Sequence, residues 1–173
     1  AAKDVCDLPV IATLTFEADG RTLFGTDAKT AAVVLESLGA SAIGANCSTG
    51  PAQVEGIISD MISVTMIPII AKPNAGLPFL DENGTTCYNM EAEEFTEEMQ
   101  VLVNAGATIL GGCCGTTPEF IRQLHDRFGT VAQAPATRRP EGIRYLTSER
   151  GTHSFGLEDG FIVVGARIKP TGK

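Results

Sequence analysis

The feature that most constrains the fold is a fourfold alternation of apolar, β-branched runs with helical patterns. The runs cover residues 8–16, 40–48, 67–76 and 107–115, and each continues into a glycine-rich segment. Such runs are typical of strands that are buried on both faces of a parallel sheet. Because one helical pattern separates each pair of runs, the strands have to be joined by right-handed parallel crossovers. The sequence therefore predicts an α/β fold with a parallel sheet.

The predicted helices have clear start and stop signals. A third helix is expected near 91–105, with glutamates in its first turn and a stop at Gly106. The expected caps of the other three helices are Thr26 or Asp27, Ser48 or Thr49 followed by Pro51, and Thr117 followed by Pro118.

Four such units suit either an open α/β sheet or half of a (β/α)₈ (TIM) barrel. The cysteine-bearing segments follow the carboxyl ends of the predicted strands, where barrel enzymes place their active sites. This placement favours a half barrel over residues 1–129. Residues 130–160 are expected to form a linker that contains one strand-like run, 143–148, and a second such run follows at 161–168. Residues 81–88, with the turn dipeptide Asn83–Gly84, are expected to form an extended loop.

Composition excludes several classes of protein. The net charge of −8 and the pI near 4.7 disfavour binding to nucleic acid. No apolar run approaches the roughly 20 residues that a membrane helix needs, and the start lacks a signal peptide, so we expect a cytoplasmic protein. The chain lacks an initiator methionine, and we expect it to be part of a longer protein.

Three of the five cysteines form a candidate metal site. Cys47 ends the second strand-like run, whereas Cys113 and Cys114 end the fourth, and in a parallel sheet both ends lie at the same edge. Adjacent residues of a regular strand point to opposite faces, so Cys113 and Cys114 can share a metal only if the backbone turns there. The neighbouring glycines provide that freedom.

Zinc favours thiolates in a tetrahedron, and a catalytic site keeps one of the four positions open. Three cysteines match that number, and their combined charge suits a soft thiol in the fourth position. The alternatives are a buried structural role for the cysteines, a vicinal disulfide switch, or a closed structural metal site. Cys6 and Cys87 are expected to be ordinary core cysteines, and His125 and His153 to lie on the surface.

Two asparagines lie beside the candidate site. Asn46 precedes Cys47, and Asn74 follows the third strand-like run. At these positions an amide could bind substrate or a thiolate, and the alternative is an asparagine that only forms a turn.

Four segments together resemble a known family. They are TFEADGRTLFGTD (15–27), GANCSTGP (44–51), KPNAGLP (72–78) and GGCCGTTPEFI (111–121). Their order resembles that of the homocysteine S-methyltransferases, and within them the zinc-binding domain of cobalamin-dependent methionine synthases. The resemblance covers roughly residues 8–128. It implies a Zn²⁺ ion held by Cys47, Cys113 and Cys114, in a barrel of which residues 1–129 form the C-terminal half.

The resemblance also implies partners that this chain lacks. The N-terminal half of the barrel would carry most contacts to homocysteine, so we expect the fragment alone to be inactive. Residues 161–173 resemble the start of a folate (pterin) domain, although Ala166 and Lys169 replace the usual Glu and Asn. Whether that downstream domain binds folate therefore stays open.

The main hypothesis is methyl transfer to the thiol of homocysteine, which forms methionine, with methylcobalamin on another domain as the donor. Betaine and S-methylmethionine are alternative donors, because related enzymes with the same cysteines use them. A structural metal site and an incomplete, non-catalytic barrel fragment are the rival hypotheses.

Overall fold

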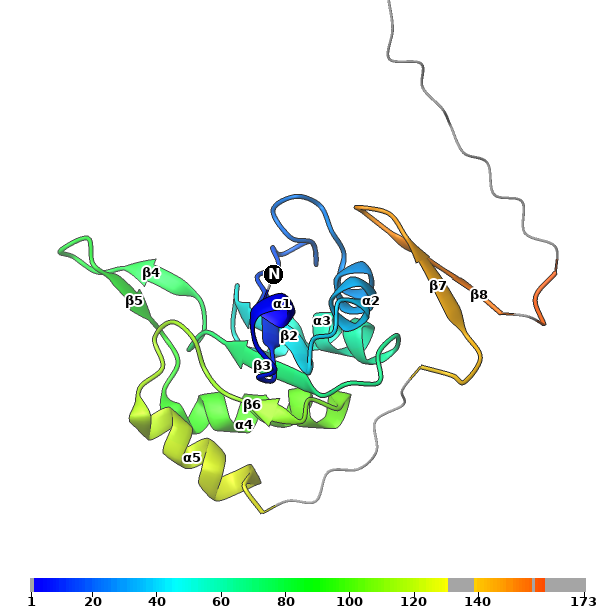
Figure 1. The fold of residues 1–173 in the computed structure, drawn as a ribbon. Coiled ribbons are helices and arrows are strands. Elements are labelled where there is room, and N and C mark those ends of the chain that lie inside the picture. Colours follow the sequence, from blue (N-terminus) through cyan, green and yellow to red (C-terminus); the bar gives the residue numbers. More distant parts are fainter. Residues whose placement is uncertain (1, 131–138, 157, 161–173) are drawn as a thin grey trace, which may run out of the picture.

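One four-stranded parallel sheet lies at the centre of the computed structural model, which describes residues 2–130, 139–156 and 158–160 (Figure 1). The strand order is β1-β2-β3-β6, the same as the chain order. These strands are β1 (Ile11–Leu14), β2 (Ala42–Cys47), β3 (Ile69–Pro73) and β6 (Ile109–Leu110). The predicted α/β fold with a parallel sheet is confirmed, although each strand is shorter than its predicted run.

Four helices follow the four strands, after a single turn α1 (Ala2–Val5). They are α2 (Ala28–Ser37), α3 (Pro51–Ile62), α4 (Ala92–Ala105) and α5 (Pro118–Phe128). Asp27 caps α2, since its carboxylate accepts the N–H of Thr30 at 2.8 Å. The left-handed Gly106 ends α4 as predicted.

The predicted cap of α3 is wrong. Neither Ser48 nor Thr49 is the N-cap; Gly50 occupies that position and makes no side-chain cap bond. Ser48 is used elsewhere, because its hydroxyl accepts the N–H of Phe16 at 3.1 Å. Thr117 does occupy the N-cap of α5, but its hydroxyl makes no capping bond.

The helices α2 to α5 form a single layer in chain order. Helix α3 packs on α2 and α4, and α4 packs on α5. Phe95 of α4 and Phe120 of α5 meet edge to face with ring centroids 5.3 Å apart. A sheet and a helix layer that both follow the chain order are consistent with part of a (β/α)₈ barrel family.

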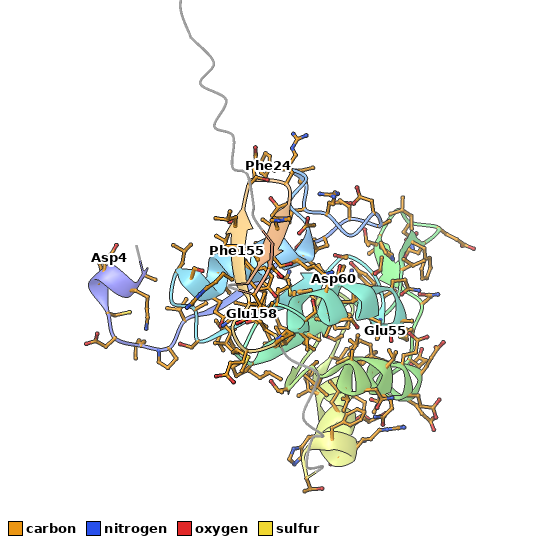
Figure 2. The ribbon with its side chains drawn as sticks, turned by 90° about the vertical axis from the view of Figure 1, so that its right-hand side faces the viewer. Asp4, Phe24, Glu55, Asp60, Phe155 and Glu158 are labelled. Atoms are coloured by element: carbon orange, nitrogen blue, oxygen red, sulfur yellow. The ribbon has the colours of Figure 1, made fainter. Side chains whose placement is uncertain are left out.

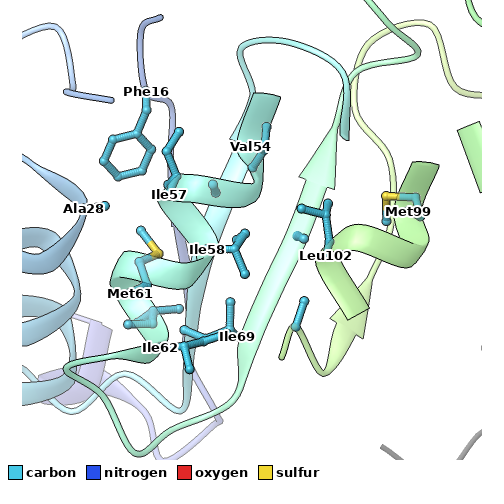
Figure 3. Packing of buried hydrophobic residues seen from close by; sticks show 14 of the residues in the cluster. Phe16, Ala28, Val54, Ile57, Ile58, Met61, Ile62, Ile69, Met99 and Leu102 are labelled. Carbon is cyan, nitrogen blue, oxygen red and sulfur yellow. The ribbon is translucent and has the colours of Figure 1, made fainter. Parts of the chain in front are cut away.

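The core lies between the helix layer and one face of the sheet (Figure 3). Alternate residues of the central strands face it, namely Ile43 and Ala45 of β2 and Ile69 and Ala71 of β3. The opposite face carries the partners Asn46 and Lys72, which pair directly across β2 and β3. The polar residues of this second face lead to the end of the sheet where Cys47 lies.

Two antiparallel hairpins extend from this unit. The pair β4 (Pro78–Leu80) and β5 (Thr86–Tyr88) replaces the expected extended loop, with Gly84 left-handed in its turn. The pair β7 (Arg144–Thr147) and β8 (Thr152–Phe155) confirms the strand-like run at 143–148. It shows that part of the expected 130–160 linker has regular structure.

The hairpin of β7 and β8 packs on α2. The neighbouring helix α3 exposes the carboxylates of Glu55 and Asp60 on its outward face (Figure 2). The hydroxyls of Thr30 and Thr152 lie 2.8 Å apart, and the Arg21 guanidinium donates to the Arg150 carbonyl at 3.0 Å. These contacts hold the hairpin on the outside of α2, away from the cysteines.

The expected start of a folate domain, residues 161–173 with Ala166 and Lys169, lies outside the described residues. Among the residues that the structure describes, no helix combines the length and apolar character needed to cross a bilayer.

Gly44 gives a direct test of the β2–β3 pairing. A Cβ at this position would overlap the backbone carbonyl of Ile70, so we expect Gly44→Ala to lower the free energy of unfolding by about 3 kcal/mol or to prevent folding. Gly56, on the exposed side of α3, has open space for a Cβ, so Gly56→Ala should raise stability by about 0.5–1 kcal/mol. Urea unfolding of both variants measures the difference, and equal effects would contradict the register.

Candidate metal centre

Three loops at the carboxyl ends of β2, β3 and β6 bring the candidate cysteines together. Cys47 is the last residue of β2, whereas Cys113 and Cys114 follow β6 in the loop that leads to α5. Their sulfur atoms all lie within 4.8 Å of one another, and the Sγ atoms of Cys113 and Cys114 are 3.9 Å apart. The structure therefore places three thiols from two segments that are distant in the sequence in one cluster.

Cys47 reaches the cluster because the backbone leaves its regular conformation there. Cys47 and Ser48 have φ values of 57° and 67°, in the left-handed region that side chains other than glycine rarely adopt. The N–H of Thr49 donates to the Cys47 carbonyl at 3.0 Å, which closes a three-residue turn around Ser48. The turn ends the alternation of β2 and redirects the Cys47 side chain.

A β-turn over Cys113–Thr116 positions the other two cysteines. The N–H of Thr116 donates to the Cys113 carbonyl at 3.3 Å, and the Thr116 hydroxyl donates to the same oxygen at 2.8 Å. Gly115 has φ of 80° at the third position, where a type II turn requires a positive value. The turn confirms the expectation that the backbone has to bend before adjacent cysteines can face one site.

Asn74 ties the three loops together. Its side-chain oxygen accepts the N–H of Cys114 at 3.1 Å, and its own N–H donates to the Thr49 carbonyl at 3.0 Å. Only 5% of Asn74 is exposed, so this amide is part of the interior. Asn46 is less buried; it donates to the Thr15 hydroxyl at 3.3 Å and hydrogen-bonds the Cys47 thiol. Both asparagines contact the cysteine segments, and contact with substrate remains a prediction.

The thiols of Cys47 and Cys113 have pKa values that move in opposite directions. Burial opposes ionisation of Cys47, but hydrogen bonds from Cys113, Asn46 and Cys114 outweigh it and, with the nearby Lys72 ammonium, lower its pKa. Burial raises the pKa of Cys113 to about 11, helped by hydrogen bonds with Cys47 and Cys114 and by their negative charge. Cys47 thus ionises before Cys113, and its charge disfavours a thiolate at Cys113.

The donor set fits a zinc ion. Zinc–sulfur bonds of about 2.3 Å at tetrahedral angles separate neighbouring sulfur atoms by roughly 3.8 Å, close to the 3.9 Å between Cys113 and Cys114. Within the described part of the chain, no histidine or carboxylate joins the three thiols. The cluster could therefore supply three of the four ligands that a zinc ion takes.

The other cysteines and the histidines lie elsewhere. His125 and His153 are exposed, as expected. Cys6 is also exposed, so its expected place in the core is wrong; it lies beside the single turn α1, which has no buried residue. Cys87 is half-buried in β5 and stays outside the cluster.

Local sequence patterns do not identify three residues at the site. Ser48 has the residue type of a helix cap, Lys72 lies inside an apolar run, and Tyr88 ends the segment that is expected to form a loop. Lys72 could have been found by alternation, since it pairs with Asn46 on the face that leads to Cys47. Tyr88 depends on a hairpin whose position the local sequence does not reveal.

The protein is thus an α/β protein in which three thiols cluster at the carboxyl edge of a parallel sheet. Residues 1–128 match the family described as homocysteine S-methyltransferase, and the chain belongs to that family. The predicted resemblance is confirmed.

Individual relatives point the same way. Over 172 residues, or 95% of this chain, it is 32% identical to a methionine synthase of Mycobacterium leprae (strain TN). Over 170 residues, again 95% of the chain, it is 34% identical to a methionine synthase of Mycobacterium tuberculosis (strain ATCC 25618 / H37Rv). A selenocysteine Se-methyltransferase of Brassica oleracea var. italica is 38% identical over 88 residues, which are 50% of this chain and 25% of that protein. The chain spans 14% of the length of each methionine synthase.

The unequal thiols predict an order of reaction in the metal-free protein. Because the thiolate is the reactive form, iodoacetamide should alkylate Cys47 before Cys113 near pH 8. As the pH rises toward about 11, the reaction of Cys113 should accelerate about tenfold per unit, whereas that of Cys47 should level off earlier. Peptide mass spectrometry at several time points measures both rates. Equal rates at pH 8 would contradict the proposed distribution of charge.

The buried amide of Asn74 predicts a loss of stability. Asn74→Ala leaves the Cys114 N–H without its acceptor, which should cost about 1–3 kcal/mol of unfolding free energy. Asn46→Ala is the matched control, because it removes a longer bond from a more exposed amide and should cost less than about 1 kcal/mol. Urea unfolding compares the two variants, and equal losses would show that Asn74 does not hold the cysteine loop.

Proposed function

We propose that Cys47, Cys113 and Cys114 bind a zinc ion and that this chain is part of an enzyme that methylates the thiol of homocysteine to form methionine. The convergence of the three sulfur atoms within 4.8 Å is the observation that carries this proposal. The family and the methionine synthases of the two mycobacteria support the choice of reaction. When bound, zinc would lower the pKa of a substrate thiol and keep the sulfur nucleophilic.

The residues of this chain would prepare the acceptor thiol. The three cysteines hold a soft, negatively charged donor set, which suits sulfur better than a hard oxygen ligand. Three cysteine ligands would leave the fourth position of a tetrahedral zinc ion for one further ligand. In the reaction, the acceptor releases its proton and forms the S–CH₃ bond, while the donor retains the electron pair of the bond that breaks.

Other parts of a longer protein would supply the remaining groups. Because the chain spans 14% of the length of the matched methionine synthases, we propose that a preceding half barrel completes the site and binds the amino-acid end of homocysteine. Methylcobalamin on a further domain is the proposed methyl donor, and a folate domain is the proposed downstream neighbour. We expect the four βα units alone to bind metal without transferring methyl groups.

Zinc X-ray absorption of the purified protein tests the proposal. We expect three sulfur neighbours before homocysteine is added and four afterwards, because the substrate thiol takes the open position. Homoserine, which has a hydroxyl in place of the thiol, is the control and should leave the sulfur number at three.

Variants separate this site from a structural one. Cys113→Ser should lower zinc content, whereas Cys87→Ser should not, since Cys87 lies outside the cluster. Four sulfur neighbours before homocysteine is added would indicate a closed structural site and would overturn the catalytic proposal. A folded protein without zinc would overturn it as well.

A further inference from the structure

Tyr88 lies against the loop that carries Cys113 and Cys114. It is the last residue of β5, and its ring packs on Gly115, where an added Cβ would lie 2.5 Å from the ring carbon Cγ. The ring is half-buried and contacts the core. Gly115 therefore has two roles, because its positive φ permits the turn and its missing side chain leaves room for Tyr88.

Backbone bonds fix Tyr88 relative to Cys114. The residue after Tyr88, Asn89, accepts the N–H of Leu77 at 3.2 Å through its side-chain oxygen. The N–H of Met90 donates to the Ala75 carbonyl at 3.2 Å, and the N–H of Ala75 donates to the Cys114 carbonyl at 2.9 Å. Tyr88 and Cys114 are thus both held by the segment that follows β3.

The Tyr88 phenol lies within hydrogen-bonding reach of the Cys114 side chain. This contact, followed by burial and by the charges of Cys114, Cys47 and Cys113, raises the pKa of Tyr88 above its ordinary value. Even an unperturbed phenol, with a pKa of about 10, keeps its proton at neutral pH. A protonated phenol can donate a hydrogen bond, and a thiolate can only accept one.

We propose that Tyr88 is a positioning residue that donates its phenolic hydrogen to the Cys114 sulfur and so holds this sulfur in place as a metal ligand. The inference deepens the proposed function, on which it rests. Three thiolates around one Zn²⁺ leave a net charge of about −1, and a hydrogen bond to one sulfur disperses part of that charge. Groups that orient metal ligands in this way typically change metal affinity by 10–100-fold when they are removed.

Two conservative substitutions test the role of the hydroxyl. Tyr88→Phe removes the hydroxyl but keeps the ring on Gly115. Tyr145→Phe is the matched control, because Tyr145 is the other tyrosine of the chain, lies half-buried in β7 and has no contact with the cysteines among its described interactions. Competition with a chromophoric chelator measures the Zn²⁺ dissociation constant of the purified protein and of both variants. We expect about a tenfold weakening in Tyr88→Phe and no change in Tyr145→Phe.

A spectroscopic measurement separates hydrogen bonding from general loosening. With Co²⁺ in place of Zn²⁺, loss of a hydrogen bond raises the energy of the sulfur lone pairs, so the sulfur-to-cobalt charge-transfer band should move to longer wavelength in Tyr88→Phe alone. Thermal unfolding of the metal-free variants is expected to match that of the unaltered protein.

The outcomes distinguish the two proposals. If Tyr88→Phe binds Zn²⁺ as tightly as the unaltered protein, or if its cobalt spectrum is unchanged, the role of Tyr88 is wrong while the metal site stands. If Zn²⁺ binds but homocysteine never adds a fourth sulfur, the proposed function is wrong while the affinity difference still supports Tyr88. A protein that binds neither metal overturns both.

Discussion

The candidate site depends on backbone hydrogen bonds that continue between the loops after the strands have ended. The N–H of Cys113 donates to the Pro73 carbonyl at 2.9 Å, and the bonds of Asn74 and Ala75 extend the contact to the loops after β2 and β6. Strand β3 lies between β2 and β6, so its extension can bind both neighbours. The sulfur positions are therefore set by main-chain pairing, which explains how an exposed residue such as Cys114 can still be well placed.

This pairing also offsets local backbone strain. A residue other than glycine in the left-handed region costs on the order of 1–3 kcal/mol, and Cys47 and Ser48 both adopt it. The hydroxyl of Ser48 accepts the N–H of Phe16, and Thr49 bonds both the Cys47 carbonyl and Asn74. Each such bond contributes about 0.5–1.5 kcal/mol net. A conformation that is unfavourable by itself is kept because the surrounding bonds require it, which is typical of functional sites.

The sequence predicts the elements that depend on local patterns. Apolar runs, glycine stops and the Asp27 cap were sufficient to predict the four βα units. Because parallel strands end at a common edge, the sequence was also sufficient to predict that Cys47 lies near Cys113 and Cys114. What the sequence did not reveal depends on contacts between distant segments. Ser48 has the residue type of a helix cap, but in the structure its hydroxyl accepts the N–H of the distant residue Phe16. Tyr88 gains its place from pairing of β4 with β5 and from the space above Gly115.

Charge explains why these surroundings matter to the cluster. Without a metal ion, Cys47 ionises before Cys113, and its charge helps to raise the pKa of Cys113 to about 11, so three thiolates do not coexist near neutral pH. A metal ion has to displace the remaining protons, and its affinity therefore increases as the pH rises toward the pKa of Cys113. Lys72 acts on this cluster through its charge, which lowers the pKa of Cys47, whereas Tyr88 contacts Cys114. Lys72 belongs to β3 and Tyr88 to the hairpin that follows it, so both depend on the segment that holds the cysteine loops together.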